Sequence, residues 1–278
     1  MHILIAIQDL SNNENVPLIE MLLKFATQFT SRTDKQTTVL ANIGPGDKCF
    51  QDRIEDIIAE ACVPASLPKV KTRILKGDPV KNILQEEKSG NFDLVIVKDL
   101  PNHGLGRFFR GSKAVRIAER ALCPVLIVKG KTGPIQHILM CDSGSPESPL
   151  LGAFTARVVD LLPGEQDVTI LHVMSQISAG PEVQGEQLRA NADELIETHS
   201  PEGDLLERDL DSLDQPGLHP VPKIRHGMVV DEIMAETRSG DYDLIIIGVF
   251  RQKWQRLLLT DLSRQIIEQT DRPVLIVK

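Results

Sequence analysis

Short hydrophobic runs alternate along this chain with longer segments whose hydrophobic residues recur at helical spacing. Continuous apolar runs are typical of parallel strands covered on both faces, and a period near 3.6 indicates a helix with one buried side. In the first half, strands are predicted at Ile3–Ile7, 38–43, 69–75, 94–97 and Val125–Val128, and helices after Pro17 and at 54–61, 80–87 and 112–122. The second half repeats this order from 138–141 to Val274–Val277. Strict alternation of strand and helix predicts a parallel sheet with helices on both faces.

An internal repeat explains why the two halves look alike. The hexapeptide Pro-Val-Leu-Ile-Val-Lys occurs at residues 124–129 and again at 273–278. Upstream of it, the similar runs Asp-Leu-Val-Ile-Val and Asp-Leu-Ile-Ile-Ile begin at Asp93 and Asp243, which are 150 positions apart. Several landmarks repeated in one order indicate two copies of one domain.

The spacing between the copies changes along the chain. His2-Ile-Leu corresponds to His137-Ile-Leu at an offset of 135, whereas Gly77 corresponds to Gly227 at an offset of 150. The second copy therefore carries an insertion of about fifteen residues between these landmarks. We predict a first domain at 1–129, a linker at 130–136 and a second domain at 137–278, and we expect so short a linker to keep the domains packed together.

Composition and charge narrow the classes of partner. The net charge of −8 and the pI near 5.4 argue against binding nucleic acid through its phosphates, and an aromatic content of 4% leaves few side chains on which bases could stack. No apolar stretch approaches the roughly 20 residues that cross a bilayer, so we expect no membrane partner. The four cysteines lie in or beside apolar runs without metal-ligand spacing, which predicts buried free thiols in a cytoplasmic protein.

The inserted part of the second half, at 176–220, is strongly acidic. Eleven Asp and Glu residues face only Arg189 and Arg208 there, a net charge of −9 against −8 for the whole chain. One interpretation is a docking face for a basic partner. The other, which we favour, is a solvated helix and loop that aid solubility.

A series of motifs follows the same order in both halves. The first half has Asp93-Leu-Val-Ile-Val, a glycine-bearing loop, Gly111-Ser112, a helix and Cys123-Pro-Val-Leu-Ile-Val, and the second has Asp142-Ser-Gly-Ser and Arg272-Pro-Val-Leu-Ile-Val. Together these motifs resemble the universal stress protein family over nearly the whole chain. The resemblance implies two tandem Rossmann-like domains of the adenine nucleotide alpha hydrolase-like type, each a five-stranded parallel sheet with helices on both faces. It also implies that ATP is bound by some members of the family and not by others.

The ATP-binding members of that family carry a loop of pattern Gly-x-x-Gly-(nine residues)-Gly-Ser/Thr after the fourth strand. Small residues let backbone N–H groups approach phosphate oxygens, and the closing Gly-Ser begins a helix whose positive end faces the anion. The resemblance implies cofactor-binding positions at Gly104, Gly111 and Ser112, and Ser112 is also well suited as an N-cap. A serine cap beside a solvated basic loop explains the same residues equally well.

The first half departs from the family pattern at three places. Lys98 and Pro101 stand where the first two glycines are expected, and Gln8 stands where the family has an Asp that accepts hydrogen bonds from adenosine. Pro101 has no N–H to donate. We expect the Lys98 side chain to fill space that the family leaves to the nucleotide, although a lysine there is also able to reach a phosphate.

The second half departs from the pattern differently. Asp142 and Gly248 match the adenosine-side acid and the first loop glycine, but bulky residues follow at 251–254. Asp261 stands at the Gly-Ser position, where its carboxylate would repel a phosphate by more than the roughly 0.3–1 kcal/mol that a helix dipole offers. We therefore expect no nucleoside triphosphate in this half.

Motifs for catalysis are missing from the sequence. It has no nucleophile elbow, no Walker loop and no two-histidine metal helix, so an enzyme is the less favoured class and no catalytic or metal residues are predicted. The leading hypothesis is a stress-response nucleotide sensor that holds ATP or another adenine nucleotide in the first domain. A nucleotide-free interaction protein is the alternative, and a weak ATPase or phosphoryl transferase is a remote one.

The last strand of each half has an expected partner. Related single-domain proteins commonly dimerise through this strand, so the resemblance implies that Val125–Val128 pairs with Val274–Val277 within one chain. A homodimer and an unknown protein partner remain open.

Overall fold

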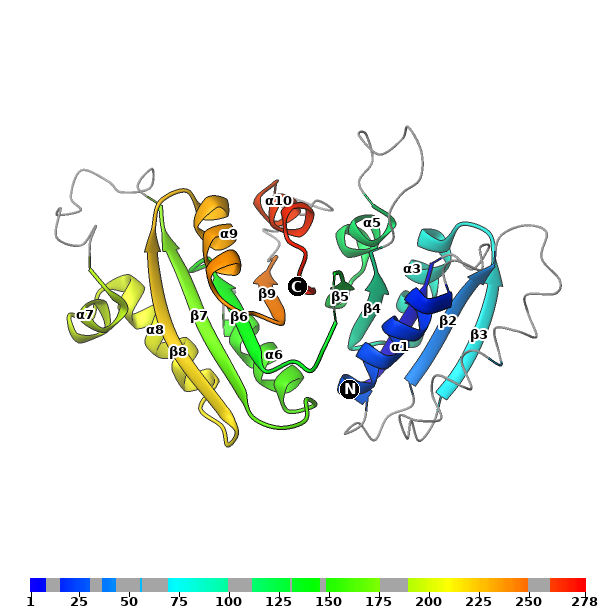
Figure 1. The fold of residues 1–278 in the computed structure, drawn as a ribbon, viewed down its shortest axis with the longest axis horizontal. Helices are drawn as coiled ribbons and strands as arrows, with labels where there is room; N and C mark the ends of the chain where they lie inside the picture. The colour runs from blue at the N-terminus through cyan, green and yellow to red at the C-terminus, as the bar shows by residue number, and fades with distance from the viewer. Residues whose placement is uncertain are drawn as a thin grey trace. The chain divides into compact units, whose positions relative to one another are not determined.

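The computed structural model describes residues 1–8, 16–30, 37–43, 56, 70–99, 112–130, 132–145, 149–175, 190–249 and 261–278. The chain divides into two compact units, Met1–Pro134 and Ile135–Lys278. Each unit contains parallel strands with helices packed against them (Figure 1).

The described residues of the first unit form a parallel sheet in the order β3-β2-β1-β4-β5. Chain order reverses between β1 and β4, which lie side by side in the middle of this sheet. The elements are β1 (Ile3–Ile7), α1 (Val16–Thr30), β2 (Thr37–Ile43), β3 (Val70–Lys76), α3 (Pro79–Gly90), β4 (Leu94–Lys98), α5 (Lys113–Arg120) and β5 (Val125–Val128).

The second unit is also parallel and has the corresponding strand order, β8-β7-β6-β9-β10, in which β6 takes the place of β1 and β9 that of β4. Here the chain order reverses between β6 and β9. The elements are β6 (His137–Asp142), α6 (Pro149–Val159), β7 (Gln166–Met174), α7 (Ala192–Glu197), α8 (Pro201–Ser212), β8 (Leu218–His226), α9 (Val229–Ser239), β9 (Leu244–Gly248), α10 (Asp261–Gln269) and β10 (Val274–Val277).

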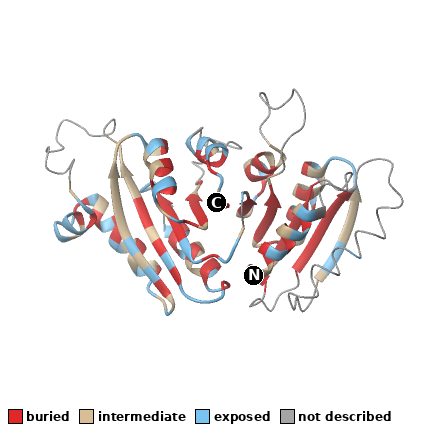
Figure 2. Cartoon of the chain, in the orientation of Figure 1, coloured by how far each residue is buried: buried red, intermediate tan, exposed pale blue. Residues whose placement is uncertain are grey.

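The core of each unit is built from strands that are apolar on both faces. Every residue of β1 and β4 is buried, and the central strands of both sheets are drawn almost wholly as buried (Figure 2). Helix α1 buries Ile19, Leu22 and Phe29 along one side while Glu20 and Lys24 stay exposed. This is the pattern expected of a helix that covers a sheet with one face.

The predicted fold is confirmed in both halves. Each strand predicted by its range lies within one or two residues of its expected bounds, and the parallel order follows from the strict alternation of elements. The helix predicted at 54–61 lies outside the described residues, apart from Asp56.

The acidic range 176–220 is more than the solvated helix and loop that we expected. Its described part contains α7, α8 and the beginning of β8. Helix α8 buries Leu205, Leu206 and Asp209, and it packs against α6 and β7. The described part of the range is therefore part of the folded unit, with one face of α8 buried against its neighbours.

Candidate functional site

The candidate site of each unit lies at the carboxyl ends of the two strands where chain order reverses. Ligands of open α/β sheets bind at this place, since the loops after the two strands diverge and leave a crevice. In the first unit these are the ends of β1 and β4, and in the second the ends of β6 and β9. Lys98 ends β4, Asp142 ends β6 and Gly248 ends β9, so three of the site residues predicted from the sequence are strand ends.

The strand register shows which residues of the two units correspond. Ala6 lies beside Val97, and Cys141 lies beside Ile247. One position further on, Asp142 is next to Gly248, and its counterpart beside Lys98 is Ile7. Between the two units, the counterpart of Asp142 is therefore Ile7, one residue before Gln8.

Gln8 is nevertheless part of the first site. Its side-chain amide donates a hydrogen bond to the backbone carbonyl of Lys98 at 2.9 Å. The side chain is buried, and its Oε1 atom has no hydrogen-bond partner among the described residues. Because buried polar atoms are nearly always paired, an unpaired acceptor at a strand end is a feature to which a ligand could bind.

Lys98 is 8% exposed, which is unusual for a lysine. Burial lowers the pKa of its ammonium, the nearby charge of Asp99 raises it, and Lys129 lowers it further. Asp99 itself pairs with Lys129, at 3.6 Å. A buried ammonium agrees with the expectation that this side chain fills space at the end of the strand.

Ser112 is the N-cap of α5, as predicted. Its Oγ atom accepts a hydrogen bond from the backbone N–H of Val115 at 3.2 Å, which satisfies one of the free donors at the helix start. The other two positions implied in this loop, Gly104 and Gly111, lie outside the described residues, as does Pro101.

In the second unit, the carboxylate of Asp142 is fully buried and already has partners within the chain. Arg208 of α8 donates to its Oδ2 atom at 2.7 Å, and the backbone N–H of Gly144 donates to Oδ1 at 2.8 Å. Nδ1 of His172 on β7 lies 3.0 Å from the backbone carbonyl oxygen of Asp142. The acid predicted to face adenosine is therefore held by an arginine from a helix 66 positions further along the chain.

A second acid shares the same arginine. Asp209 is 1% exposed, and its Oδ1 atom accepts from Nη2 of Arg208 at 2.9 Å and from Nε at 3.2 Å. Burial raises the pKa of Asp209 to about 8, hydrogen bonding to Asp142 and the charge of that acid add to the rise, and Arg208 partly opposes it. A buried carboxyl group that shares one cation with a second acid keeps its proton to a higher pH than an exposed one.

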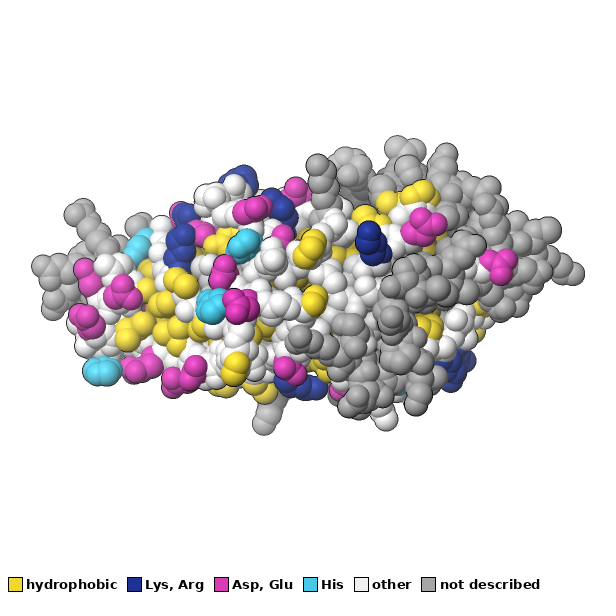
Figure 3. Space-filling model, turned by 60° about the horizontal axis from the view of Figure 1, so that its bottom comes forward, with side chains coloured by type: hydrophobic (Ala, Val, Ile, Leu, Met, Phe, Trp, Pro, Cys, Tyr) yellow, Lys and Arg dark blue, Asp and Glu magenta, His cyan; other side chains and the backbone are white. Residues whose placement is uncertain are grey.

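Sequence reasoning missed Arg208 and Asp209 because it treated the acidic range as surface. The sequence did contain one indication of a specific role for Arg208. It is one of only two basic residues in the range 176–220, which holds eleven acids with which it could pair. Seven of the nine acids in the described part of this range are exposed. In the space-filling view, acidic and histidine side chains border a group of hydrophobic ones (Figure 3).

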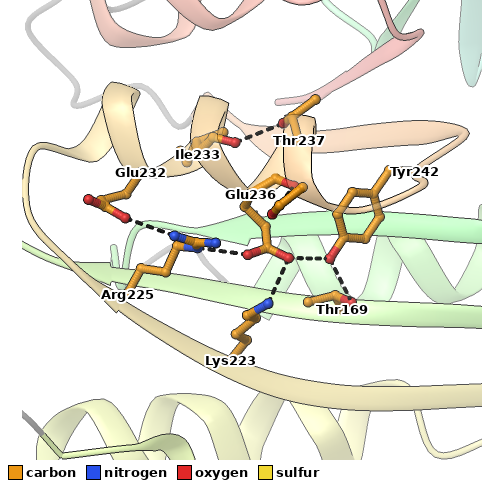
Figure 4. Close-up of polar contacts among 9 residues, drawn as sticks. Thr169, Lys223, Arg225, Glu232, Ile233, Glu236, Thr237 and Tyr242 are labelled. Atoms are coloured by element: carbon orange, nitrogen blue, oxygen red, sulfur yellow. Dashed lines mark hydrogen bonds and ion pairs between the residues drawn. The ribbon is translucent and has the colours of Figure 1, made fainter.

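A separate buried carboxylate, that of Glu236, lies on the buried side of α9. Glu236 accepts hydrogen bonds from Nζ of Lys223 at 2.8 Å, Nε of Arg225 at 2.7 Å and the hydroxyl of Tyr242 at 2.6 Å (Figure 4). Burial raises the pKa of Glu236, but these hydrogen bonds and the charge of Lys223 lower it more, so the net shift is downward. Every donor comes from the same unit, which makes this cluster a structural element rather than a ligand site.

No metal site is assigned among the described residues. Ligand atoms of His199, Asp204 and Glu207 come within 4.8 Å of one another, but all three side chains are exposed. Asp204 stands in the first turn of α8, where the helix dipole favours acids without any ion. No described helix is long and apolar enough to cross a membrane.

Comparison with known proteins places this architecture in a family. The model of the Universal stress protein family matches residues 21–129 and 134–278. The chain therefore belongs to the universal stress protein family and carries two copies of its domain.

Individual relatives agree with this assignment. A universal stress protein of Thermus aquaticus is 31% identical over 78 residues, which cover 28% of this chain and 57% of that protein. A protein of unknown function from Pseudomonas aeruginosa covers the whole chain and 92% of its own, with a TM-score of 0.69 and 18% identity. A universal stress protein from Archaeoglobus fulgidus aligns over 99% of this chain and 96% of its own, with a TM-score of 0.65 and 18% identity. At such identities the two structures support the fold alone.

Proposed function

We propose that this chain is a cytoplasmic stress-response binding protein that holds an adenine nucleotide, with modest affinity, in its first unit only. The observation that carries the proposal is the difference between the strand ends of the two units. In the second unit the carboxylate of Asp142 is already paired with Arg208. In the first unit Gln8, with its unpaired buried acceptor, lies beside the buried Lys98 at the end of β4, and the next described element along the chain is α5 with its capped start.

The second unit is closed to a nucleoside triphosphate for two reasons. A ligand hydroxyl or amine that needs Asp142 must first displace Arg208, whose guanidinium already forms a charge-assisted hydrogen bond there. Asp261 adds a like charge at the start of α10, where a phosphate would otherwise meet the N-terminus of a helix.

The first unit offers the groups that a phosphate needs. The backbone N–H groups of the first turn of α5 point toward the start of the helix, where Ser112 accepts a hydrogen bond from that of Val115. Gly111 immediately precedes this start and has no side chain that would block the approach of an anion. Because Ile7 replaces the acid and Lys98 is buried, part of the family's usual contact set is lost, and the affinity is modest.

Thermal unfolding with and without ATP tests the proposal. Ligand at 100 times its dissociation constant adds about 2.7 kcal/mol to the free energy of unfolding, which is easily measured. Because the proposed affinity is modest, millimolar ATP falls short of that excess, and we expect only a small upward shift in Tm. Gly111→Val should abolish that shift, since a branched side chain would block the helix start. A large ATP shift that survives Gly111→Val would contradict a site in the first unit.

Ser112→Ala needs a matched control because it also removes a cap. Loss of a cap alone lowers the free energy of unfolding by about 0.5–2 kcal/mol. Asp78 caps α3 in the same way, accepting from the N–H of Lys81 at 3.0 Å. Asp78→Ala should therefore destabilise the protein without changing the ATP-induced shift, whereas Ser112→Ala should reduce that shift.

Lys98→Gly decides the role of the buried lysine. If the side chain fills the site, as its burial favours, the change opens space and increases the affinity for ATP measured by calorimetric titration. A clear loss of affinity would show that Lys98 binds the phosphate instead.

A nucleotide-free interaction protein is the second candidate. It is favoured by the same two features that weaken the first site, Ile7 in place of an acid and the buried Lys98. Denaturing the purified protein and analysing the released small molecules separates the two candidates. An adenine nucleotide released in amounts close to one per chain supports the first, and none released, together with no ATP-induced shift in Tm, supports the second.

Pairing of the two units through their last strands is also part of the proposal. β5 and β10 each end the strand order of their own unit, so each would leave one apolar edge without a partner inside that unit. A fragment of residues 1–134 should therefore dimerise or aggregate. A stable monomer in dilute solution would contradict this pairing.

A further inference from the structure

The contact between α8 and the end of β6 joins one arginine and two aspartates. Arg208 reaches Oδ2 of Asp142 at 2.7 Å and Oδ1 of Asp209 at 2.9 Å. The two carboxyl groups are almost completely buried, while the arginine side chain is 35% exposed. Two acids thus share one guanidinium, and the group carries one negative charge too many unless a proton is bound.

The packing around Asp209 leaves little space for water. A Cβ atom at Gly152 of α6 would lie 2.1 Å from Oγ of Ser212 on α8, so the two helices touch closely at this point. Leu205 and Leu206 of α8 are buried beside the cluster. Oδ2 of Asp209 has no hydrogen-bond partner among the described residues, which is costly for an oxygen of a charged carboxylate and less so for the carbonyl oxygen of a neutral carboxyl group.

The other charged groups on the elements packed against α8 are mostly exposed or paired elsewhere. α7 and β8 also pack against α8; the acids of α7 are exposed, and Lys223 and Arg225 of β8 pair with Glu236. From β7, His172 faces the cluster and lies within hydrogen-bonding distance of the Asp142 carbonyl through Nδ1. From α6, Thr155 is buried and uncharged, and Arg157 is exposed, with its guanidinium 5.7 Å from the ring of Phe154. On α8 itself, Glu207 and Asp211 are exposed.

We propose that Asp142, Arg208 and Asp209 form a proton-dependent latch that fastens α8 to the end of β6. With one proton shared between the two acids, the single arginine balances the remaining charge and the helix stays packed. Without that proton, two buried carboxylates compete for one cation, and α8 separates more readily from the sheet. Separation would uncover Asp142 and the buried side of α6.

The direction of the pH dependence follows from the raised pKa of Asp209, about 8 in the closed form. When α8 opens, water reaches the carboxyl group and its pKa returns to the acid range. The closed form therefore binds the proton more tightly, and the latch is strongest at low pH. As the pH rises toward 8, the opening equilibrium increases by up to tenfold for each pH unit, and above about 8 it levels off.

Hydrogen exchange of the full chain between pH 5.5 and 9 tests the latch. Protection factors, which divide out the intrinsic pH dependence of exchange, should fall with pH for the amides of α8 and level off above about pH 8. Amides of β6 and β9 should keep their protection, because only the helix opens. A constant protection of α8 across this range would overturn the proposal.

Asp209→Asn supplies the decisive variant, since the amide keeps the shape of a protonated acid but does not titrate. Its α8 protection should be independent of pH, whereas Asp211→Asn, an exposed change on the same helix, should behave like the unmodified protein. The same fall with pH in Asp209→Asn would contradict the assignment. If Asp209→Asn does not fold, the carboxyl ¹³C shift of Asp209 in the unmodified protein decides: titration near pH 8 supports the latch, and titration in the acid range alone overturns it.

Discussion

The two units keep the same buried carboxylate but surround it with different partners. Glu86 on α3 and Glu236 on α9 stand 150 positions apart, at equivalent places in the repeat. In the first unit, Nη1 of Arg73 lies 2.6 and 2.5 Å from the two oxygens of Glu86. In the second unit, Lys223 replaces Arg73, and Arg225 and Tyr242 add two more hydrogen bonds. The buried glutamate is thus present in both units, and in each unit at least one cationic side chain from a strand pairs with its carboxylate.

The aromatic residues that follow these acids in the sequence also combine a feature common to both units with one that differs. Phe92 in the first unit and Tyr242 in the second are equivalent, and each ring lies against a glycine two residues earlier. A Cβ atom at Gly90 or Gly240 would come within 2.2 Å of the ring in either unit. Close packing thus constrains the ring and the glycine together, whereas the hydroxyl that reaches Glu236 is free to differ between the copies.

The largest difference between the units should follow removal of the two acids. Glu236→Ala leaves Lys223 without its acceptor and Arg225 with Glu232 alone. It should lower the free energy of unfolding by about 3–5 kcal/mol, toward the lower end because both cations are partly exposed. Glu86→Ala leaves only Arg73, whose side chain is 40% exposed and can be hydrated, so about 1–3 kcal/mol is expected. Calorimetry, with hydrogen exchange to assign each transition to a unit, measures both. Equal losses would show that the extra partners of Glu236 add nothing.

The pH dependence of the second unit should weaken with the same change. The pKa of Glu236 is lowered in the folded protein, so its stabilisation is present above the usual glutamate range and is lost as the pH falls through the folded pKa. Unfolding monitored from pH 7 to pH 3 should therefore show a smaller loss in Glu236→Ala than in the unmodified protein. An unchanged acid profile would mean that other carboxyl groups control it.

Tyr242→Phe removes the hydroxyl group by which Tyr242 differs from Phe92, its equivalent in the first unit. It removes a 2.6 Å hydrogen bond to a charged, buried acceptor, and such bonds contribute about 1.5–3 kcal/mol. Because Phe92 occupies the equivalent place in the first unit, the ring itself should fit and the packing should not change. Chemical unfolding measures the loss, and a loss below about 0.5 kcal/mol would show that Lys223 and Arg225 suffice for Glu236.

The smallest expected effect concerns the caps of the helices that carry the acids. Asp78 caps α3 through its side chain, whereas Met228, its equivalent before α9, makes no such bond and is 57% exposed. Met228→Asn should supply the missing acceptor and raise the free energy of unfolding by about 0.5–2 kcal/mol. Asparagine is preferred to aspartate because Asp231 and Glu232 already occupy the first turn. No gain in Tm would indicate that the start of α9 cannot adopt the cap geometry.

The fold was predictable because its signals are local and repeated. Apolar runs such as Ile3–Ile7 and Val125–Val128 identify buried strands by themselves, and the second copy of each motif confirms the interpretation of the first. The cap at Ser112 was predictable for the same reason, since it involves only the following three residues. The offset of 135 between His2 and His137 already places Ile7, and not Gln8, opposite Asp142, and the strand register agrees with that offset. The motif comparison missed this because it aligned the acid's position without applying the offset of the repeat.

What the sequence alone determined is the class of the protein: two α/β units of one family, the order of their elements and the strand ends at which a site can form. What only the tertiary structure decided is the state of each site. Arg208 reaches Asp142 across 66 positions of chain because α8 packs over the end of β6. Lys98 is buried by the elements around it and not by any property of its own sequence. The Arg208–Asp142 pair and the burial of Lys98 both need segments that are far apart in the sequence to lie side by side. Those segments come together only when the hydrophobic faces of the helices pack against the sheet.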